Sequence, residues 1–311
     1  MEVCRNLDHW HTPGAVLTMG FFDGVHLGHQ YLLERVKREA AKRGCPAVVF
    51  TMWPHPRIVL GLEPQTFRLI NDLDYKLELL DRMGIDAAVV LDFTMEQSQL
   101  EPEAFLQTIL YDKIKPQAVF IGYDHRYGHK GAGDYALLSQ FAKTHGFDAF
   151  LGEAISCERH ELSSTLVRTT IASGDMALAE RYLGRSFLFN GSVVAGHQIG
   201  RTIGFPTANI KPRSGWQLLP GHGVYSGYCV IGDCRPEVRY KAVINVGTRP
   251  TVDAEGTTSI EAHLLDFSGN LYGRKLGVAF SRKLRNELRF ASIESLSEQI
   301  ARDVAMVRRE E

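Results

Sequence analysis

The stretch Ala15-Val-Leu-Thr-Met-Gly-Phe-Phe-Asp-Gly-Val-His-Leu-Gly-His29 joins a short apolar run to a turn rich in glycine and histidine. The run at residues 15–19 is typical of a buried strand, and residues 29–43 repeat apolar side chains at helical spacing before Gly44. A strand, a glycine-rich turn and a helix in this order place backbone N–H groups and a helix N-terminus around an anion. The stretch therefore predicts an α/β domain whose first turn binds phosphate.

Further apolar runs extend this pattern along the first half of the chain. They lie at residues 47–52, 87–91, 118–121 and 149–151, and helical patterns separate them. Regular alternation of strand and helix indicates parallel strands with helices on both faces. We therefore predict a doubly wound parallel sheet with a ligand site at the carboxyl ends of its strands.

The pattern changes after a helical stretch at residues 164–183. Strand-like runs follow, with Gly and Pro turns and no helical pattern between them, at residues 187–194, 224–231, 242–246, 260–266 and 276–280. This succession predicts a small β-barrel or sandwich. A last helix is expected at residues 292–309, with an apolar stripe formed by Leu296, Ile300, Val304 and Val307. We place one domain at residues 1–183 and a second at residues 187–311.

Length and composition agree with two folded domains. The chain has 311 residues, of which 44% are hydrophobic and 23% are charged, and its formal net charge is −1. This balance argues against disorder and gives no basic excess for nucleic acid, so small-molecule ligands are expected. The five cysteines are scattered without metal-ligand spacing, and no run approaches the roughly 20 apolar residues of a membrane span. We expect a cytoplasmic protein with reduced cysteines and no membrane partner.

His26 and His29 stand three residues apart where the first helix begins. Both imidazoles can point at one bound group and donate hydrogen bonds to the oxygens of a phosphorus under attack. Such chemistry depends on positioning and charge stabilisation, which an electropositive pocket with Mg²⁺ supplies, and it needs no covalent nucleophile. Two alternatives remain. The histidines can be a helix cap or a surface pair, or they can belong to a metal site, although the motif provides no third ligand.

Three other segments of the first half place polar side chains at the ends of predicted elements. Leu162-Ser-Ser-Thr-Leu-Val-Arg168 opens a helix with hydroxyls and an arginine, which suits the β and γ phosphates of a nucleotide. Its alternative interpretation is an ordinary N-cap. The segments at residues 53–56 and 122–128 follow strands, where a doubly wound sheet forms its site, although either can be a plain turn.

A second glycine-rich signature, Gly196-His-Gln-Ile-Gly-Arg-Thr-Ile-Gly-Phe-Pro-Thr-Ala-Asn209, lies in the other half of the chain. Gly196, Gly200 and Gly204 permit close approach of the backbone to phosphates. Thr207 and Asn209 alternate along a predicted strand, so both oxygens can face one side and bind a hard cation that bridges nucleotide phosphates. The alternative is a hairpin with ordinary turn glycines.

Glu261 lies in a later strand-like run, where alternation turns its carboxylate either into the barrel or out to water. An inward carboxylate near a bound hydroxyl is suited to act as a general base. The alternative is a solvated strand residue, which is the more common role of a glutamate.

The first-half motifs Gly-Phe-Phe-Asp-Gly-Val-His-Leu-Gly-His-Gln, Pro-His-Pro, Gly-Tyr-Asp-His-Arg-Tyr-Gly and Ser-Ser-Thr-Leu-Val-Arg occur in this order. They resemble the FAD synthetase module of the bifunctional bacterial riboflavin kinase/FAD synthetase family, one of the His-x-Gly-His nucleotidylyltransferases. The resemblance implies that His26 and His29 stabilise the α-phosphoryl transition state while the FMN phosphate attacks and pyrophosphate leaves. The residues implied in nucleotide binding are Gly20, Phe22, Asp23, Gly28, Asp124, Ser164, Thr165 and Arg168. His125 departs from the pattern, since many members have Phe there, and is expected to tune the pocket.

The second-half segments at residues 200–209, 220–225, 245–251 and 284–290, together with Glu261, resemble a riboflavin kinase module. The resemblance implies a six-stranded barrel in which Glu261 activates the ribityl 5′-hydroxyl. It also implies Mg²⁺ and ATP ligands at Thr207 and Asn209. The residues implied in nucleotide binding are Gly196, Gly200, Arg201, Gly204 and Pro206, and those implied in flavin binding are Arg285, Glu287 and Phe290.

Taken together, the motifs indicate a bifunctional enzyme. It would convert riboflavin and ATP to FMN in the barrel, and FMN and ATP to FAD in the α/β domain, with Mg²⁺ in both reactions. Two alternatives remain: a riboflavin kinase with a degenerate adenylyltransferase domain, and a flavin-binding regulator without turnover. The intact Glu261, Thr207 and Asn209 argue against the regulator, because a pure binder needs no base beside a metal–phosphate site.

Overall fold

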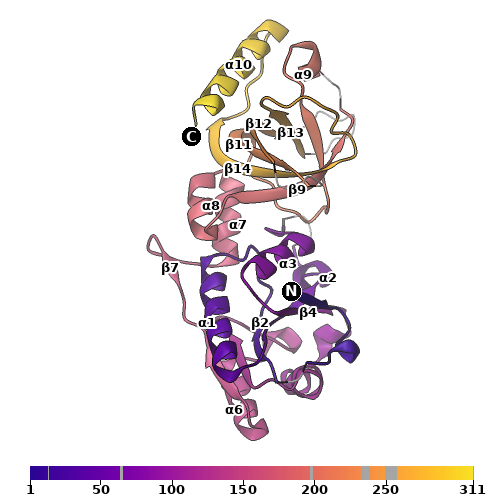
Figure 1. Ribbon diagram of the computed structural model, residues 1–311, viewed down its shortest axis with the longest axis vertical. Helices are drawn as coiled ribbons and strands as arrows, with labels where there is room; N and C mark the ends of the chain where they lie inside the picture. The colour runs from indigo at the N-terminus through magenta and orange to yellow at the C-terminus, as the bar shows by residue number, and fades with distance from the viewer. Residues whose placement is uncertain (13, 64–65, 197–198, 233–237, 249–257, 311) are drawn as a thin grey trace. The chain divides into compact units, whose positions relative to one another are not determined.

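The computed structural model describes residues 1–311 except 13, 64–65, 197–198, 233–237, 249–257 and 311 (Figure 1). The chain divides into two compact units. The first contains Met1–Phe67 and Leu73–Ser164, and the second contains Arg68–Asp72 and Thr165–Glu311. This division places the helical residues 165–183 in the second unit. The domain limits at residues 183 and 187 stay a prediction.

The first unit is built on a six-stranded sheet in the order β1-β4-β3-β2-β5-β6, in which all neighbouring strands run parallel. The strands are β1 (Glu2–Cys4), β2 (Val16–Met19), β3 (Ala47–Trp53), β4 (Ala87–Asp92), β5 (Ala118–Ile121) and β6 (Asp148–Leu151). The predicted parallel sheet is confirmed. Strand β1 was not predicted, because its short sequence carries too little periodicity to be recognised.

Helices and turns cover the sheet of the first unit. One face packs its apolar core against the segment that contains Phe105, Leu106, Leu110 and Ile114, and against Leu138 and Ala142. Helix α1 lies against β2 and β3. The helical elements are η1 (Leu7–His9), α1 (Leu27–Arg43), α2 (Pro56–Val59), α3 (Leu73–Arg82), η2 (Gln97–Gln99), α4 (Pro102–Phe105), the π-helical η3 (Leu106–Tyr111), α5 (Asp112–Ile114), η4 (His129–Gly131) and α6 (Tyr135–His145).

Helix α1 begins two residues earlier than predicted, at Leu27. The reason is a cap: the imidazole Nδ1 of His26 accepts a hydrogen bond from the backbone N–H of His29. The helix ends as predicted at Gly44, which has a left-handed conformation with φ of 63°.

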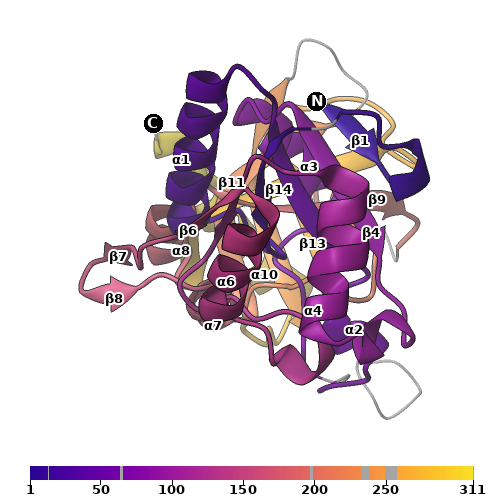
Figure 2. The ribbon, with the colours of Figure 1, turned by 90° about the horizontal axis from the view of Figure 1, so that it is seen from below.

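Strands β2 and β5 are neighbours in the sheet although two strands separate them in the chain. Met19 at the end of β2 pairs with Ile121 at the end of β5, so the turns after both strands emerge at one edge. The strand order reverses here, which is where open α/β sheets bind their ligands. A small hairpin of β7 (Ser156–Cys157) and β8 (His160–Glu161) projects from this unit in both views (Figure 1 and Figure 2).

The second unit contains a closed barrel in the order β10-β13-β12-β11-β14-β9, with antiparallel neighbours throughout. The strands are β9 (Phe187–Val194), β10 (Ala208–Pro212), β11 (Gly223–Ile231), β12 (Arg239–Thr248), β13 (Thr258–Leu264) and β14 (Lys275–Arg285). The predicted six-stranded barrel is confirmed. A one-turn helix, α9 (Ile199–Thr202), lies between β9 and β10, where no helix was expected.

The helical stretch expected at residues 164–183 is two helices, α7 (Ser164–Ser173) and α8 (Met176–Leu183). Gly174 separates them with φ of 85°. The Asp175 side chain then accepts a hydrogen bond from Leu178 N and caps the second helix. Periodicity alone did not reveal this break, because apolar spacing continues across it.

Helix α10 (Ile293–Arg309) closes the chain and begins after Ser292 with a capping box. Its residues Val304 and Val307 pack with Val224, Val243 and Leu265 of the barrel unit. On the same helix, the buried Asp303 accepts from the Arg285 guanidinium, at 2.7 Å between Oδ2 and Nη2 and 3.2 Å between Oδ1 and Nε. This ion pair fixes the end of β14 to α10.

We predict that Asp303→Asn lowers the free energy of unfolding by about 3–5 kcal/mol, because it leaves the Arg285 charge without its anion in a poorly hydrated site. The measurement is urea denaturation followed by far-UV circular dichroism. The matched control is Glu298→Gln on the same helix. Glu298 forms an exposed pair with Arg302 at 3.3 Å, so the change should be below about 0.5 kcal/mol. Equal effects of the two variants would contradict a structural role for the buried pair.

Candidate active site

The turn after β2 has a backbone that side chains rarely adopt. Phe22, Gly24 and Val25 have φ values of 50°, 86° and 40°. For Phe and Val such a conformation costs about 1–3 kcal/mol each. Both side chains are buried, at 2% and 1% exposure, so their packing offsets this cost. The turn therefore depends on its surroundings for its shape.

Side chains from neighbouring elements donate hydrogen bonds to the carbonyl groups of this turn. The contacts are Lys76 Nζ to Phe21 O at 3.1 Å, Thr51 Oγ1 to Phe21 O at 3.4 Å, Ser164 Oγ to Asp23 O at 2.9 Å, and Gln30 Nε2 to Val25 O at 2.9 Å. Carbonyl oxygens carry partial negative charge and repel phosphate. Holding them with internal donors leaves the turn suited to an anion, as predicted.

His26 and His29 form a stacked pair at the N-terminus of α1. Their ring centroids lie 3.7 Å apart with an interplanar angle of 19°. Nδ1 of His26 accepts from His29 N at 3.4 Å, so a neutral His26 carries its proton on Nε2. The capping role that stood as an alternative is therefore present, and it is compatible with chemistry, because it fixes a tautomer whose Nε2–H is a donor.

Gly28 is required by the shape of this pair. A Cβ atom at position 28 would lie 3.2 Å from Cε1 and Nδ1 of His26 and 3.7 Å from Cβ of Leu162. The two contacts at 3.2 Å are tighter than ordinary packing, so an added methyl group requires the imidazole to shift by a few tenths of an ångström. The glycine of the His-x-Gly-His motif thus keeps the His26 ring in place.

The structure brings several other predicted residues to this turn. Gly20 follows β2 and its N–H donates to Phe50 O at 3.1 Å, while the Phe22 ring lies 5.1 Å from the His29 ring. Asp23 is buried, and Ser164 contacts it through the hydrogen bond given above. Asp124 is exposed in the turn after β5. Thr165 and Arg168 belong to the second unit, and their roles at this site stay predictions.

The predicted segment at residues 53–56 forms an aromatic wall beside the turn. His55 caps α2 by accepting from Arg57 N at 3.2 Å. Its ring lies 4.5 Å from the Phe21 ring and 4.8 Å from the Phe67 ring. The segment is therefore more than a plain turn, since it fixes one side of the loop that follows β2.

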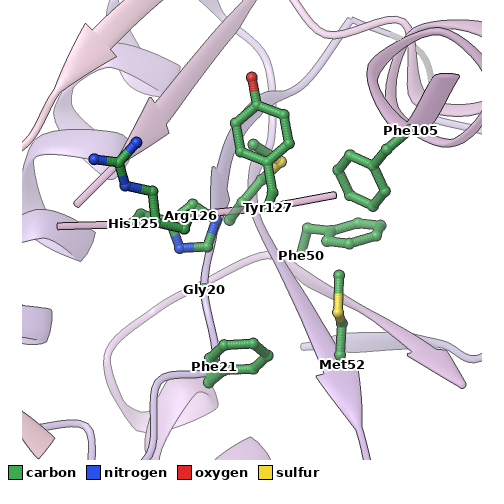
Figure 3. A pocket seen from close by; sticks show the side chains of 9 residues that line it. Gly20, Phe21, Phe50, Met52, Phe105, His125, Arg126 and Tyr127 are labelled. Atoms are coloured by element: carbon green, nitrogen blue, oxygen red, sulfur yellow. The ribbon is translucent and has the colours of Figure 1, made fainter. Parts of the chain in front are cut away.

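An apolar cavity opens at the reversal point of the sheet (Figure 3). It contains about 20 Å³ of space, room for little more than a water molecule, and is lined by Met19, Gly20, Phe21, Phe50, Met52, Phe105, His125, Arg126 and Tyr127. Figure 3 shows Phe50, Phe105 and Met52 grouped on one side of it. His125 lies nearly parallel to Tyr127, at 22°, and burial lowers the pKa of its imidazole to about 4. The imidazole is therefore neutral near pH 7 and acts as a largely apolar wall.

In the second unit, strand pairing brings three polar side chains into one row. Asn209 on β10 pairs with Glu261 on β13, and Glu261 pairs with Asn245 on β12. Residues opposite one another on neighbouring strands share a face of the sheet. Glu261 is half-buried, whereas its neighbours Ile260 and Ala262 are buried. The carboxylate is thus on the less buried face of β13 and has amide side chains on both sides.

The predicted glycines shape the loop over this row. A Cβ atom at Gly196 would overlap the side-chain amide of Asn209, and one at Gly200 would overlap the carbonyl oxygen of Phe205. Gly204 has φ of 84°. These positions require glycine for close approach or for backbone conformation, which is what the predicted phosphate loop needs. Residues 197–198 of the predicted signature lie outside the described residues.

A groove with about 510 Å³ of space lies beside this loop. Three predicted nucleotide or metal residues line it, namely Arg201, Pro206 and Thr207. The opposite wall, at residues 267–272, was not predicted. Its sequence Phe-Ser-Gly-Asn-Leu-Tyr is typical of a turn between strands, and nothing in its pattern indicates a binding site.

The predicted flavin residues lie together at the end of β14. The Arg285 guanidinium binds Asp303 and lies 5.9 Å from the Phe290 ring centre. Glu287 is exposed, and its Oε1 lies 3.5 Å from Nδ2 of Asn245 in the row that contains Glu261. Flavin binding by these residues stays a prediction. Residues 249–251 of the predicted segment 245–251 are not among the described residues.

Within the described part of the chain, no group of three or more His, Cys, Asp or Glu side chains is placed to hold a metal ion. The alternative of a protein metal site at the histidine pair therefore gains no support. Among the same residues, no helix is both long and apolar enough to cross a membrane.

Comparisons with known proteins cover both halves of the chain. A family model described as FAD synthetase matches residues 8–166, and one described as riboflavin kinase matches residues 183–310. The fold and the two sites thus define a protein that joins an adenylyltransferase-type α/β domain to a kinase-type barrel. The chain belongs to the bifunctional riboflavin kinase/FMN adenylyltransferase family, which confirms the resemblance drawn from the motifs.

Two curated relatives carry the family's name, and one solved structure shares the fold of the whole chain. The chain is 38% identical over 299 residues to the bifunctional riboflavin kinase/FMN adenylyltransferase of Escherichia coli (strain K12), covering 96% of this chain and 93% of that protein. It is 37% identical over 311 residues to the protein of the same name from Pseudomonas fluorescens, covering 99% and 97%. A crystal structure described as a macrolide-efflux protein from Streptococcus pneumoniae is 27% identical, with a TM-score of 0.88 and 99% coverage of both chains.

We predict that Gly28→Ala lowers the rate of FAD formation from FMN and ATP about tenfold or more, because the added methyl displaces the His26 ring. The phosphorylation of riboflavin by the same preparation should stay within about twofold. Gly215→Ala is the matched control, since a Cβ there meets nothing within 4 Å. An unchanged rate of FAD formation in Gly28→Ala would show that the position of the His26 ring does not limit the reaction.

A second prediction concerns the pH dependence of stability. The pKa of His125 is about 4 in the folded protein and near 6.5 when unfolded, so the unfolded state binds more protons between these values. Stability should therefore fall as the pH is lowered from about 6.5 to 4. His125→Phe should remove about 1–3 kcal/mol of that loss, measured by urea denaturation at pH 7 and pH 4.5. An identical loss in both proteins would contradict the assignment.

Proposed function

We propose that this chain catalyses two consecutive reactions of flavin cofactor synthesis. The barrel phosphorylates riboflavin with ATP to give FMN and ADP, and the α/β domain transfers the adenylyl group of ATP to FMN, giving FAD and pyrophosphate. The observation that supports this most directly is the presence of both sites in one chain. One is a stacked histidine pair on an anion-binding turn. The other is the Glu261 carboxylate with an amide side chain on each neighbouring strand, in a barrel whose glycine-rich loop borders a groove.

In the α/β domain, the chain's own groups position and stabilise. The Nε2–H of His26 and the His29 imidazole donate to the oxygens of the ATP α-phosphorus as negative charge develops on them. The FMN phosphate attacks this phosphorus, the bond to the bridging oxygen breaks, and pyrophosphate leaves.

In the barrel, Glu261 is the proposed general base. Its carboxylate takes the proton of the ribityl 5′-hydroxyl while that oxygen attacks the γ-phosphorus of ATP. Asn209 and Asn245, its cross-strand neighbours, limit where the carboxylate can point. Glu287 and Phe290 stand at the edge of this row, where they suit contact with the flavin.

Thr207 and Asn209 supply oxygen donors for Mg²⁺, as the sequence predicts. A hydroxyl and an amide oxygen suit this ion, which takes few protein ligands and binds largely through nucleotide phosphates and water. When bound, Mg²⁺ neutralises charge on the phosphates.

Cytoplasmic location is proposed on the state of the cysteines. Cys4, Cys45, Cys157 and Cys229 are all free thiols, as in reducing compartments. Cys234 lies outside the described residues. Riboflavin, FMN and ATP are the proposed small-molecule partners, and the expectation that neither nucleic acid nor membrane is a partner stays a prediction.

The two activities should separate by mutation. We predict that Glu261→Gln lowers riboflavin phosphorylation at least about 100-fold while FAD formation from supplied FMN is retained. His29→Ala should do the reverse, because it removes a donor from the α-phosphoryl transition state. Chromatography of flavins after incubation with ATP and Mg²⁺ measures both reactions.

Controls for this experiment are on the surface of the same chain. Glu298→Gln replaces an exposed carboxylate and His160→Ala an exposed imidazole, and both should leave the two activities unchanged. If the unmodified protein converts riboflavin to neither FMN nor FAD, the proposed function is wrong. If FAD formation persists in His29→Ala, the assignment of the histidine pair is wrong.

A further inference from the structure

Lys76 is a buried cation behind the phosphate-binding turn that neither the motifs nor the proposed reaction uses. It lies on α3 among apolar positions, with Leu73, Leu79 and Leu80 on the same buried side, and is 4% exposed. Fully buried lysines are rare, because removing the ammonium group from water is costly unless it is paired. The burial of Lys76 at this position therefore calls for compensating contacts.

The ammonium group of Lys76 contacts the turn directly. Its Nζ donates to the carbonyl oxygen of Phe21 and to the Thr51 hydroxyl, both at 3.1 Å, and Thr51 Oγ1 in turn lies 3.4 Å from the same carbonyl. Thr51 is 1% exposed in β3. The Trp53 ring is 5.7 Å from Nζ. The Lys76 side chain is thus enclosed by protein, and its ammonium group donates a hydrogen bond to the backbone at the Phe21 carbonyl.

The carbonyl that Lys76 holds is the one at which the backbone enters the unfavourable conformation. Phe22, the next residue, has φ of 50°, and Val25 with φ of 40° precedes His26. A turn of this kind persists only when its surroundings determine it. Releasing the Phe21 carbonyl would let it rotate toward the anion site and would free the peptide units that lead to the histidine pair.

Burial of the charge carries a cost that the folded protein bears. Desolvation lowers the pKa of Lys76 to about 8 from its usual value near 10.5, and the nearby Asp23 carboxylate opposes this shift. The residue is still protonated near pH 7. An apolar side chain of similar length would remove the desolvation cost of the ammonium group, and it would also remove the attraction to Asp23 and the hydrogen bonds to Phe21 and Thr51.

We propose that Lys76 is a positioning residue for adenylyl transfer: by holding the Phe21 carbonyl together with Thr51, it keeps the turn at residues 20–25 in the shape that presents His26 and His29 to the α-phosphorus. The inference rests on the proposed function of the α/β domain. It makes adenylyl transfer depend on Lys76, a residue that contacts neither the substrates nor the reacting atoms.

The test is Lys76→Met in the full-length chain, with both activities and thermal unfolding measured on one preparation. We expect kcat for FAD formation from FMN to fall at least about 30-fold, with KM for FMN and ATP changed less than about threefold, because positioning affects the transition state more than binding. Riboflavin phosphorylation should stay within about twofold. The assays are run well below the unfolding midpoint of the variant, so that a lowered kcat for FAD formation reports positioning and not unfolding.

Thr51 provides an independent variant in case Lys76→Met does not fold. Thr51→Val keeps the shape of the side chain and removes the hydroxyl, and should lower kcat for FAD formation, whereas Thr51→Ser keeps the hydroxyl and should retain most of it. Lys42→Met, which changes a lysine with a 74% exposed side chain on α1, is the control.

Distinct outcomes separate this inference from the proposed function. If the unmodified protein forms no FAD, the function itself fails. If it forms FAD and Lys76→Met does so within about threefold of it, the positioning role is overturned while the function stands. A fall of both activities together with the unfolding midpoint would also overturn it, since Lys76 would then only stabilise the fold.

Discussion

The first site depends on one constraint: the carbonyl groups of the turn after β2 must be held away from the bound phosphate. A run of residues with positive φ, including Phe22 and Val25, is unfavourable for an isolated chain. Internal donors from α3, β3, α1 and the start of α7 overcome this preference. The stacked histidine pair begins where this turn ends, so the positions of the two imidazoles depend on the shape of the turn.

In the barrel, the register between neighbouring strands positions the polar side chains of the second site. Glu261 is fixed between Asn209 and Asn245 by backbone pairing on both sides, and the loop over it comes close because glycines at 196 and 200 leave room. The Asp303–Arg285 pair ties the end of β14 to α10 beside this row. In both units a regular sheet fixes the positions of the site residues, and an irregular segment next to it is suited to contact phosphate.

The sequence predicted what depends on local pattern. Apolar runs indicated the strands, Gly44 indicated the end of α1, and the glycines at residues 20–28 with His26 and His29 indicated the phosphate turn. What the sequence did not predict depends on contacts between distant segments. Lys76 and Asp303 are charged residues on amphipathic helices, and only the fold shows that both are buried. A charged residue inside an apolar stripe was the available signal. The register of Glu261 likewise required pairing between distant strands.

The central claim is that the histidine pair stabilises charge while the FMN phosphate itself attacks the α-phosphorus. The most direct measurement is the stereochemical course at that phosphorus, followed with a single diastereomer of ATP carrying sulfur on the α-phosphate. One in-line displacement predicts inverted configuration in the flavin product. Retained configuration would require two displacements through a covalent adenylyl-enzyme, and would contradict the account.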